Sequence, residues 1–208
     1  MIIKSVRSIL IVSFLVTLLS ALRPVERVHA LSAYPSSEDL PALISFVNQV
    51  KNGQAGELRG LYVPELLAVP VIQQPAGDHE FVSPRSNTVT QFGLASRYGS
   101  TGLLAHNYLA GQNFSLLEKN QKFYLVFGDG QVTTFVITEI LQYQALEPDS
   151  TSSRFVGLED NTLLTTAELF AQVYHRDGTV VLQTCISRDN DLSWGRLFVI
   201  AEPYSPVP

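Results

Sequence analysis

The chain has one cysteine, Cys185, among 208 residues. A single cysteine cannot form an internal disulfide, so its thiol is either a reactive group or a small apolar filler. Charged residues are also scarce, at 16%, and the net charge of −5 comes with no basic cluster. This composition excludes nucleic acid as an expected partner. Histidine, cysteine and acidic residues show no metal-ligand spacing, so no metal or other cofactor is expected.

A hydrophobic run long enough to span a membrane is missing as well. The apolar run at 8–22 has about fifteen residues, whereas a membrane span needs roughly twenty. It follows Lys4 and Arg7 and precedes small residues that suit a cleavage site, such as Ala30. Residues 1–30 are therefore predicted to be a signal peptide or an N-terminal membrane anchor. Either alternative puts the rest of the chain on the extracellular face of the cell envelope, secreted or anchored, with membrane contact only through this segment.

The remaining sequence fits one globular domain, because 46% of all residues are hydrophobic and 10% are aromatic. Residues 31–59 are predicted to form an N-terminal helix and linker. From 60 to 208, short β-type runs alternate with turns, and a clear hairpin covers 122–140. One short helix, with a threonine cap, is expected at 165–173. This spacing predicts a mainly β fold: a closed barrel of about eight strands with a few short helices.

Three side chains are candidates for chemistry. Cys185 ends the run Thr179–Ile186, whose β-branched residues predict a strand. After a polar loop, Arg196 opens a second predicted strand, where it would lie beside the cysteine. His106 follows the apolar run Gly102–Ala105, at a strand end. Together they could supply a nucleophile, a general acid–base and a donor to a developing oxyanion.

Each candidate also has a structural interpretation. A lone cysteine often fills a buried apolar space, and an arginine at a strand start is usually solvated. For His106 a structural role is an equal alternative, whereas His79 and His175 are expected at exposed positions in a polar loop and a turn. Arg188 also follows Cys185 and is a second candidate for the arginine role, although we expect it in the polar loop. The sequence alone does not bring any of these side chains together.

The motifs around the candidates resemble those of sortases. The run Leu182-Gln183-Thr184-Cys185, with Arg196 eleven residues later, resembles the carboxy-terminal signature of that family. The upstream run that ends in Ala105-His106 is similar to the family's apolar strand before its histidine, although sortases commonly carry glycine at the position of Ala105. The resemblance covers roughly residues 60–203. It implies a divergent sortase-like β-barrel over 60–208.

The resemblance also implies an activity. A sortase is a cysteine transpeptidase, in which Cys185 would attack a carbonyl of a sorting-signal peptide and form a thioester acyl-enzyme. His106 would act as general acid and base, and Arg196 would stabilise the oxyanion. The implied partners are the sorting signal of a surface protein and an amine acceptor on the cell envelope or on a pilin-like protein. Because no apolar tail precedes Pro208, the chain is expected to act on sorted proteins and not to be one.

Two other functions stay open at this point. A cysteine peptidase would use the same nucleophile with water as acceptor, since nothing in the sequence selects the acceptor. A non-catalytic surface binding module on the same kind of barrel would leave Cys185 unreactive. The sorting motif, the acceptor and the cleavage of the N-terminal segment are not predicted.

Overall fold

The computed structural model describes residues 39–205. The predicted signal peptide or anchor, 1–30, lies outside the described residues, as do 31–38 and 206–208. Within the described part, no helix is both long enough and apolar enough to cross a membrane.

Strands dominate the described chain. In chain order, the helices and strands are α1 (Leu40–Val50), β1 (Leu58–Val63), β2 (Leu67–Gln73), β3 (Val89–Phe92), η1 (Ala95–Tyr98), β4 (Thr101–Leu104), η2 (Ala110–Leu116), β5 (Lys122–Phe127), β6 (Val132–Ala145), β7 (Phe155–Gly157), β8 (Leu163–Leu164), α2 (Thr166–Tyr174), β9 (Val180–Arg188) and β10 (Asp191–Pro203). The elements η1 and η2 are short 3₁₀ helices.

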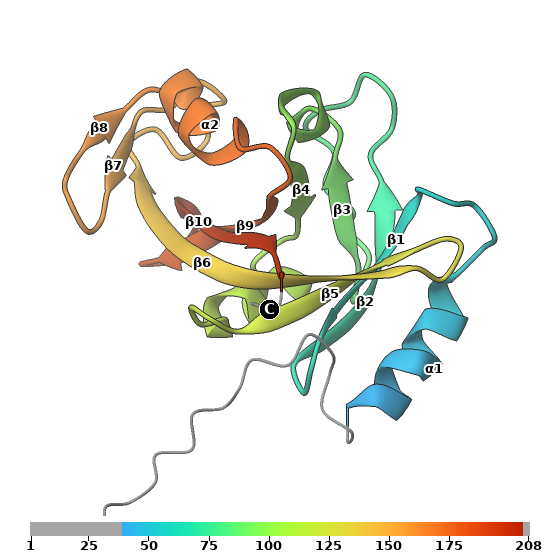
Figure 1. Cartoon of the computed structure of the whole chain (residues 1–208). Coiled ribbons are helices and arrows are strands. Elements are labelled where there is room, and N and C mark those ends of the chain that lie inside the picture. The colour runs from blue at the N-terminus through green and yellow to red at the C-terminus, as the bar shows by residue number, and fades with distance from the viewer. Residues whose placement is uncertain (1–38, 206–208) are drawn as a thin grey trace, which may run out of the picture. The chain divides into compact units, whose positions relative to one another are not determined.

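Eight of the strands close into a barrel (Figure 1). Their order is β10-β9-β4-β3-β2-β1-β5-β6, and β6 pairs back onto β10 along a long antiparallel ladder. The two short strands β7 and β8 continue from β6 outside the closed ring. Closure confirms the predicted mainly β fold, a closed barrel of about eight strands with few short helices.

Side chains alternate between the barrel interior and an outer face, as the two-residue period of a strand requires. On β9 and β10, Leu182 and Leu197 pack in the barrel core. Their neighbours Val181 and Phe198 pack outside it, in a second cluster that includes Leu169 of α2. The outer face of β9 and β10 therefore lies beneath α2, which Figure 1 draws at the same side of the barrel as β7 and β8.

The two α-helices cover different faces. The predicted short helix is confirmed as α2: the Thr165 side chain accepts the backbone N–H of Glu168, and the Glu168 carboxylate accepts the backbone N–H of Thr165. Such a capping box satisfies two N–H groups that a helix start leaves unpaired. The other helix, α1, packs Phe46 against Tyr62 of β1.

The last two strands are longer than the sequence suggested. A polar loop was expected between Ile186 and Arg196, but β9 runs to Arg188 and β10 begins at Asp191. Asp189 and Asn190 turn the chain between them, with φ of 51° and 69°. Two residues of positive φ form the tight turn that best fits the twist of a hairpin, and Asp and Asn tolerate this conformation. Arg196 therefore lies inside a strand and does not open one.

Candidate active site

The two carboxy-terminal candidates lie opposite each other. In the antiparallel pair β9–β10, Cys185 is the partner of Arg196. Directly opposite residues project from the same face of a sheet. By the alternation of β9 and β10 that face is the outer one, since Val181 and Phe198 also point outward. The thiol and the guanidinium therefore start from neighbouring positions on the face that α2 overhangs.

His106 reaches the same level from the other side of β9. The parallel pair β4–β9 places Leu104 opposite Gln183, and two further residues along this register bring His106 level with Cys185. The alignment continues beyond β4, because the N–H of Ala105 donates to the carbonyl of Gln183 at 3.2 Å. We call these three residues, His106, Cys185 and Arg196, the His–Cys–Arg row.

Thr184 ties β9 to the segment that carries the histidine. Its hydroxyl donates to the carbonyl of Ala105 at 2.8 Å, and the side chain is buried. A hydroxyl and a carbonyl that are buried without partners would destabilise the fold, so this bond fixes the spacing of the two segments. The sequence left the role of Thr184 open, and the bond gives it a supporting one.

A glycine allows η2 to pack closely against the Thr184–Ala105 hydrogen bond. The N–H of Gly111 donates to the carbonyl of His106 at 3.0 Å. A Cβ atom at Gly111 would lie 2.4 Å from the hydroxyl of Thr184 and 2.7 Å from the carbonyl of Ala105. Only glycine permits so close a backbone approach, so this residue sets how tightly the chain turns after His106.

The imidazole of His106 is half-buried and held on two sides. Its Nε2 lies 3.3 Å from the carbonyl of Val82, and Tyr108 stacks on the ring with a centroid distance of 5.1 Å and an angle of 19°. A carbonyl can only accept, so Nε2 carries the proton in this bond. In the neutral ring, Nδ1 then holds the lone pair that can take up a proton.

The guanidinium of Arg196 is oriented by backbone carbonyls. Its Nη1 donates to Ser193 at 2.8 Å and to Gly195 at 3.0 Å, and its Nη2 lies 3.5 Å from the carbonyl of Pro148. Among residues 39–205, no carboxylate forms an ion pair with it. Its charge is therefore not neutralised by a neighbouring acid and can act on an anion.

Arg188 points to a different environment. It ends β9 and does not lie in a loop, which corrects the expectation from the sequence. Its side chain is 61% exposed, pairs with Asp189 at 3.6 Å and lies over the ring of Trp194 at 4.9 Å. The register partner of Arg188 is Asp191, so this arginine does not face Cys185.

None of the three side chains of the His–Cys–Arg row hydrogen-bonds another in the described chain. The strand register brings their backbones into line, and their partnership stays a prediction. No group of three or more potential metal ligands occurs within residues 39–205.

An apolar hollow of about 230 Å³ opens beside Arg196 on the outer face. We call it the outer hollow. Its lining comes from β3, β7, α2, β9, β10 and the segment before β7: Phe92, Ser150, Thr151, Phe155, Thr166, Leu169, Phe170, Tyr174, Gln183, Arg196 and Phe198. Arg196 is the only charged residue among them, so the hollow suits an uncharged, largely apolar chain.

Tyr174 and Gln183 form a polar contact within this lining. The tyrosine hydroxyl donates to the side-chain carbonyl of Gln183, and burial raises the pKa of Tyr174. The hydroxyl therefore stays protonated and serves as a donor at neutral pH. Gln183 lies two residues before Cys185 on the same face of β9, so this contact braces the wall next to the thiol.

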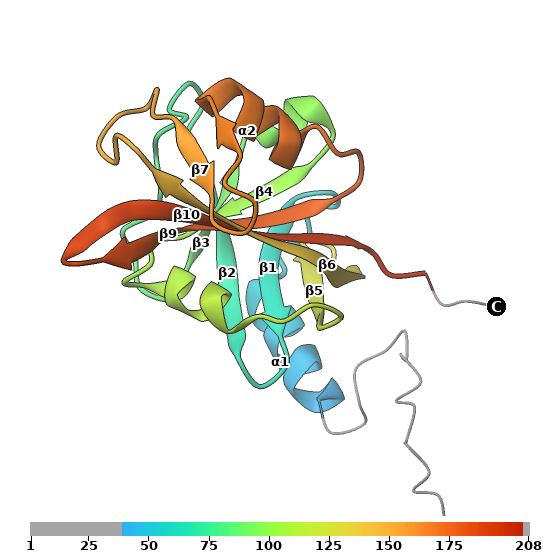
Figure 2. The same ribbon diagram turned by 90° about the vertical axis from the view of Figure 1, so that its left-hand side faces the viewer.

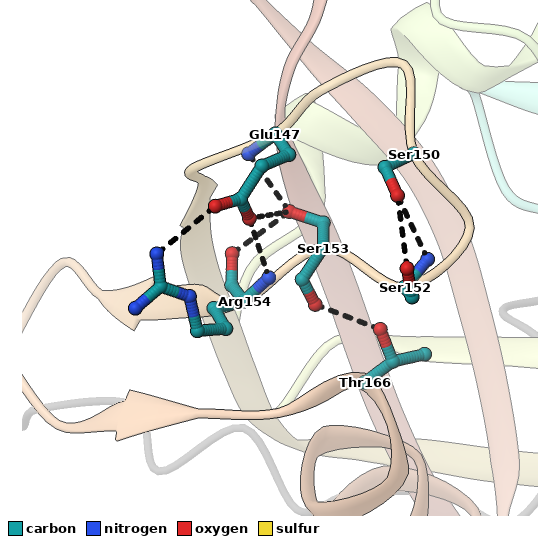
Figure 3. Close-up of polar contacts among 6 residues, drawn as sticks. All are labelled: Glu147, Ser150, Ser152, Ser153, Arg154 and Thr166. Carbon is teal, nitrogen blue, oxygen red and sulfur yellow. Dashed lines mark hydrogen bonds and ion pairs between the residues drawn. The ribbon is translucent and has the colours of Figure 1, made fainter.

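A clasp of hydrogen bonds shapes the segment 146–154, which supplies Ser150 and Thr151 to the outer hollow (Figure 3). The carboxylate of Glu147 accepts from the backbone N–H of Arg154 at 2.9 Å and from its guanidinium at 3.0 Å. Fully buried Ser153 accepts from the N–H of Glu147 at 3.0 Å. These bonds hold the two ends of the segment together. We call them the Glu147 clasp.

The same segment is pinned to α2. The hydroxyl of Thr166, the first residue of α2, lies 2.7 Å from the carbonyl of Ser153. Figure 3 shows Thr166 reaching Ser153 from below, while Glu147 and Arg154 join on the other side. The segment is therefore held together at its two ends and is also bonded to α2.

A second hollow, of about 330 Å³, borders Cys185 at one end of the barrel, beside η2. Thr184 and Leu197 line it, and both alternate with the outward-facing residues of their strands. This hollow thus belongs to the inner side of the sheet. It is lined by neutral residues only, including Asn107 and Gln112.

Several features of the site had not been predicted. Val82 and Tyr108 contact His106, and the Glu147 clasp shapes the outer hollow, and the sequence predicted none of these contacts. Tyr108 lies only two residues after His106, so the sequence could have indicated that the two rings are neighbours. Val82 lies 24 residues away from His106 in the chain and gave none.

Comparisons with known proteins gave structural matches only. No family model and no curated protein matches the chain. The chain is similar to sortase C1 from Streptococcus suis, with 13% identity, TM-score 0.49, and coverage of 85% of this chain and 89% of that one. It is also similar to sortase A from Corynebacterium diphtheriae, with 14% identity, TM-score 0.47, and coverage of 85% and 73%.

A further similar structure is sortase C from Clostridium perfringens, with 15% identity, TM-score 0.43, and coverage of 82% and 92%. The chain is therefore similar to several sortases in fold, and the similarity concerns the fold alone.

Proposed function

We propose that the chain is a sortase-like cysteine transpeptidase that cleaves a sorting-signal peptide and transfers its acyl part to an amine. The observation that supports this most is the His–Cys–Arg row. The register of two strand pairs brings the backbones of His106, Cys185 and Arg196 into line, and the guanidinium has no acidic partner in residues 39–205. Acyl transfer needs these three groups at one carbonyl.

In the acylation step, the sulfur of Cys185, as thiolate, attacks a peptide carbonyl carbon. A carbon–sulfur bond forms, and the carbonyl oxygen takes up the negative charge. The guanidinium of Arg196 donates to that oxygen. The carbon–nitrogen bond then breaks, and protonated His106 gives its proton to the departing amine.

In the deacylation step, an incoming amine attacks the thioester carbon. His106, now neutral, removes a proton from that amine, for which its Nδ1 has the lone pair. The carbon–sulfur bond breaks, and the thiolate is regenerated together with the new peptide bond. Water in place of the amine would give hydrolysis instead.

The substrate and setting follow from the same proposal. The outer hollow would hold the acyl part, since it borders Arg196 and is largely apolar. The acceptor would be an amine on the cell envelope or on a pilin-like protein. The chain would act on the extracellular face of the cell envelope, secreted or held by residues 1–30.

The test is to look for the acyl-enzyme. The full chain is incubated with a library of sorting-signal-like peptides, and Cys185 is examined by mass spectrometry, with Cys185→Ala as the control. We expect a thioester adduct that hydroxylamine discharges as the hydroxamate. Its mass identifies the peptide motif at the same time.

The outcomes separate the three functions. A thioester that an added amine converts to a new amide supports the transpeptidase. A thioester that only water discharges identifies a cysteine peptidase. No adduct, together with slow alkylation of Cys185 by iodoacetamide, would favour a binding module and contradict the proposal.

A further inference from the structure

Three aromatic rings form an exposed step at one end of the outer face. Tyr98 stacks on His175 with a centroid distance of 4.2 Å and an angle of 10°. Phe170 meets Tyr98 edge-on at 5.2 Å and His175 edge-on at 5.8 Å. Tyr98 is 43% exposed, and His175 is also exposed. We call Tyr98, Phe170 and His175 the aromatic step.

The aromatic step is continuous with the outer hollow. Phe170 lines the hollow, and it also packs on two further lining rings, Phe92 at 6.2 Å and Tyr174 at 5.0 Å. Figure 2 shows the two supporting helices, η1 with Tyr98 and α2 with Phe170, side by side above the barrel. Ring contacts therefore link the lining of the hollow to the exposed ring of Tyr98. Exposed apolar side chains that are contiguous mark an interaction site more often than scattered ones do.

The distance from the thiol to the aromatic step can be counted along β9. Gly99 follows Tyr98 and accepts a backbone bond from Gly178 at 2.8 Å, just before β9 begins at Val180. Cys185 lies five residues further along the strand. A strand rises about 3.3 Å per residue, so about 17 Å separate Cys185 from the start of β9 and about 23 Å separate it from Gly178. An extended peptide spans these two lengths with about five to seven residues.

The direction of the peptide rests on the proposed function. The proposed function places the acyl part in the outer hollow, which Arg196 borders, while Cys185 itself lines the second hollow. The residues amino-terminal to the scissile carbonyl then continue past Phe170 towards Tyr98. The leaving group lies on the opposite side of the carbonyl and does not reach the aromatic step.

We propose that the aromatic step is a peptide subsite that binds an aromatic side chain about five to seven residues amino-terminal to the scissile carbonyl. Rings recognise rings through offset stacking and edge-to-face contacts, and the aromatic step offers both geometries. The nearby Arg176 is paired with Glu139, so its charge is already engaged. An acidic side chain at that peptide position gains no free cation from Arg176.

The experiment uses a peptide that acylates Cys185, prepared in a short and a long form. The short form begins three residues before the scissile bond. The long form begins nine residues before it and carries Trp, Ala or Glu at the fifth, sixth or seventh position. The rate of thioester formation gives kcat/KM for the full chain and for Tyr98→Ala, Tyr98→Phe and Leu163→Ala. Leu163 is a matched control, because it is an exposed apolar residue of β8 outside the hollow lining.

We expect the long Trp peptide to exceed its Ala and Glu forms by roughly 2- to 12-fold in kcat/KM, the range of one aromatic pair. Tyr98→Ala should abolish this advantage, while Tyr98→Phe and Leu163→Ala keep it. The short peptide should react equally with all four proteins, which also excludes misfolding as the cause.

Two results would overturn the inference. If the Trp, Ala and Glu forms react equally, or if Tyr98→Ala keeps the Trp advantage, the aromatic step is not a subsite although the transpeptidase proposal stands. If no peptide forms a thioester, the proposed function fails, and this inference fails with it.

Discussion

Two arginines follow Cys185 in the sequence, and strand register distinguishes them. Arg196 is the antiparallel partner of Cys185, whereas Arg188 pairs with Asp191 beyond the thiol. The sequence favoured Arg196 through its resemblance to a known motif. The physical reason is the tight turn at Asp189 and Asn190, which fixes the residue that lies opposite the cysteine. Turn geometry of this kind was not evident from the residues alone.

The arginine assignment predicts different effects for three variants. Arg196→Ala should slow acylation of Cys185 by about 10²- to 10³-fold, as loss of an oxyanion donor does. Arg196→Lys should recover only part of this, because an ammonium lacks the planar fork of donors. Arg188→Ala should stay near the wild-type rate. Single-turnover thioester formation measures all three, and a large loss in Arg188→Ala alone would reverse the assignment.

Gly111 gives a second prediction for a single residue. A methyl group there would press on Thr184 and on the carbonyls of Ala105 and His106. Gly111→Ala should lower the free energy of unfolding by about 1–3 kcal/mol, a usual cost of overpacking. Urea unfolding measures it. Gly93→Ala is the control, since its Cβ would meet only one atom, at 3.7 Å. Equal stability of the two variants would contradict this account.

At the scale of elements, the sequence predicted what local chemistry determines. The threonine cap predicted the helix at 165–173, which is α2, and the β-type runs of 122–140 predicted the β5–β6 hairpin. The strands β7 and β8 went unrecognised because they have three and two residues, too few for a pattern. They exist because β6 extends beyond the residues that pair with β5. Its end can therefore pair with β7 on that edge, while β10 pairs with the opposite edge. That pairing is a long-range property.

The Glu147 clasp predicts an effect on substrate binding. In Glu147→Gln, the charge-assisted bonds to Arg154 weaken, so the segment that carries Ser150 and Thr151 loosens. KM for the peptide should rise about two- to tenfold while kcat changes less, because the row itself is untouched. Steady-state kinetics test this, with Glu118→Gln, an exposed residue near η2, as the control. A fall in kcat at constant KM would contradict a role in binding.

For the whole molecule, the carboxylates predict how stability depends on pH. Hydrogen bonds lower the pKa of four carboxylates. Asn52 and Arg59 donate to Glu57, and Arg154 donates to Glu147. Thr162 donates to Asp160, and Thr165 donates to Glu168. A carboxyl with a lowered pKa in the folded state stabilises the fold above its unfolded value, which is 4.5 for Glu and 3.8 for Asp. That contribution is lost as the pH falls through the lower, folded value.

Stability should therefore be nearly constant for these groups from pH 7 to pH 5 and decline below about pH 4.5. Urea unfolding at a series of pH values would reveal it. Because Glu147, Asp160 and Glu168 are exposed and Glu57 is only partly buried, added salt should weaken the decline. A stability that rises on acidification would contradict the assignment.

The closed barrel was predicted before the structure because short strands at regular spacing, and motifs of known order, describe a whole domain. The alignment of His106 with Cys185 could not be predicted in that way. It depends on the parallel pairing of β4 with β9, whose tie from Thr184 to Ala105 spans 79 residues of chain. No local preference fixes a contact of that range, since it follows from how the entire barrel closes.

The strand pairs that close the barrel affect how the chain folds during synthesis. The hairpin β9–β10 pairs with β4 on one side and β6 on the other, so it is the last piece of a ring that synthesis completes from the amino-terminal end. Until that hairpin docks, β4 and β6 present unpaired edges, which invite pairing with other chains. The same event brings the backbone of Cys185 into line with those of Arg196 and His106. A nascent or truncated chain therefore has an open sheet that can aggregate and lacks the proposed site, and a single folding step closes the sheet and assembles that site.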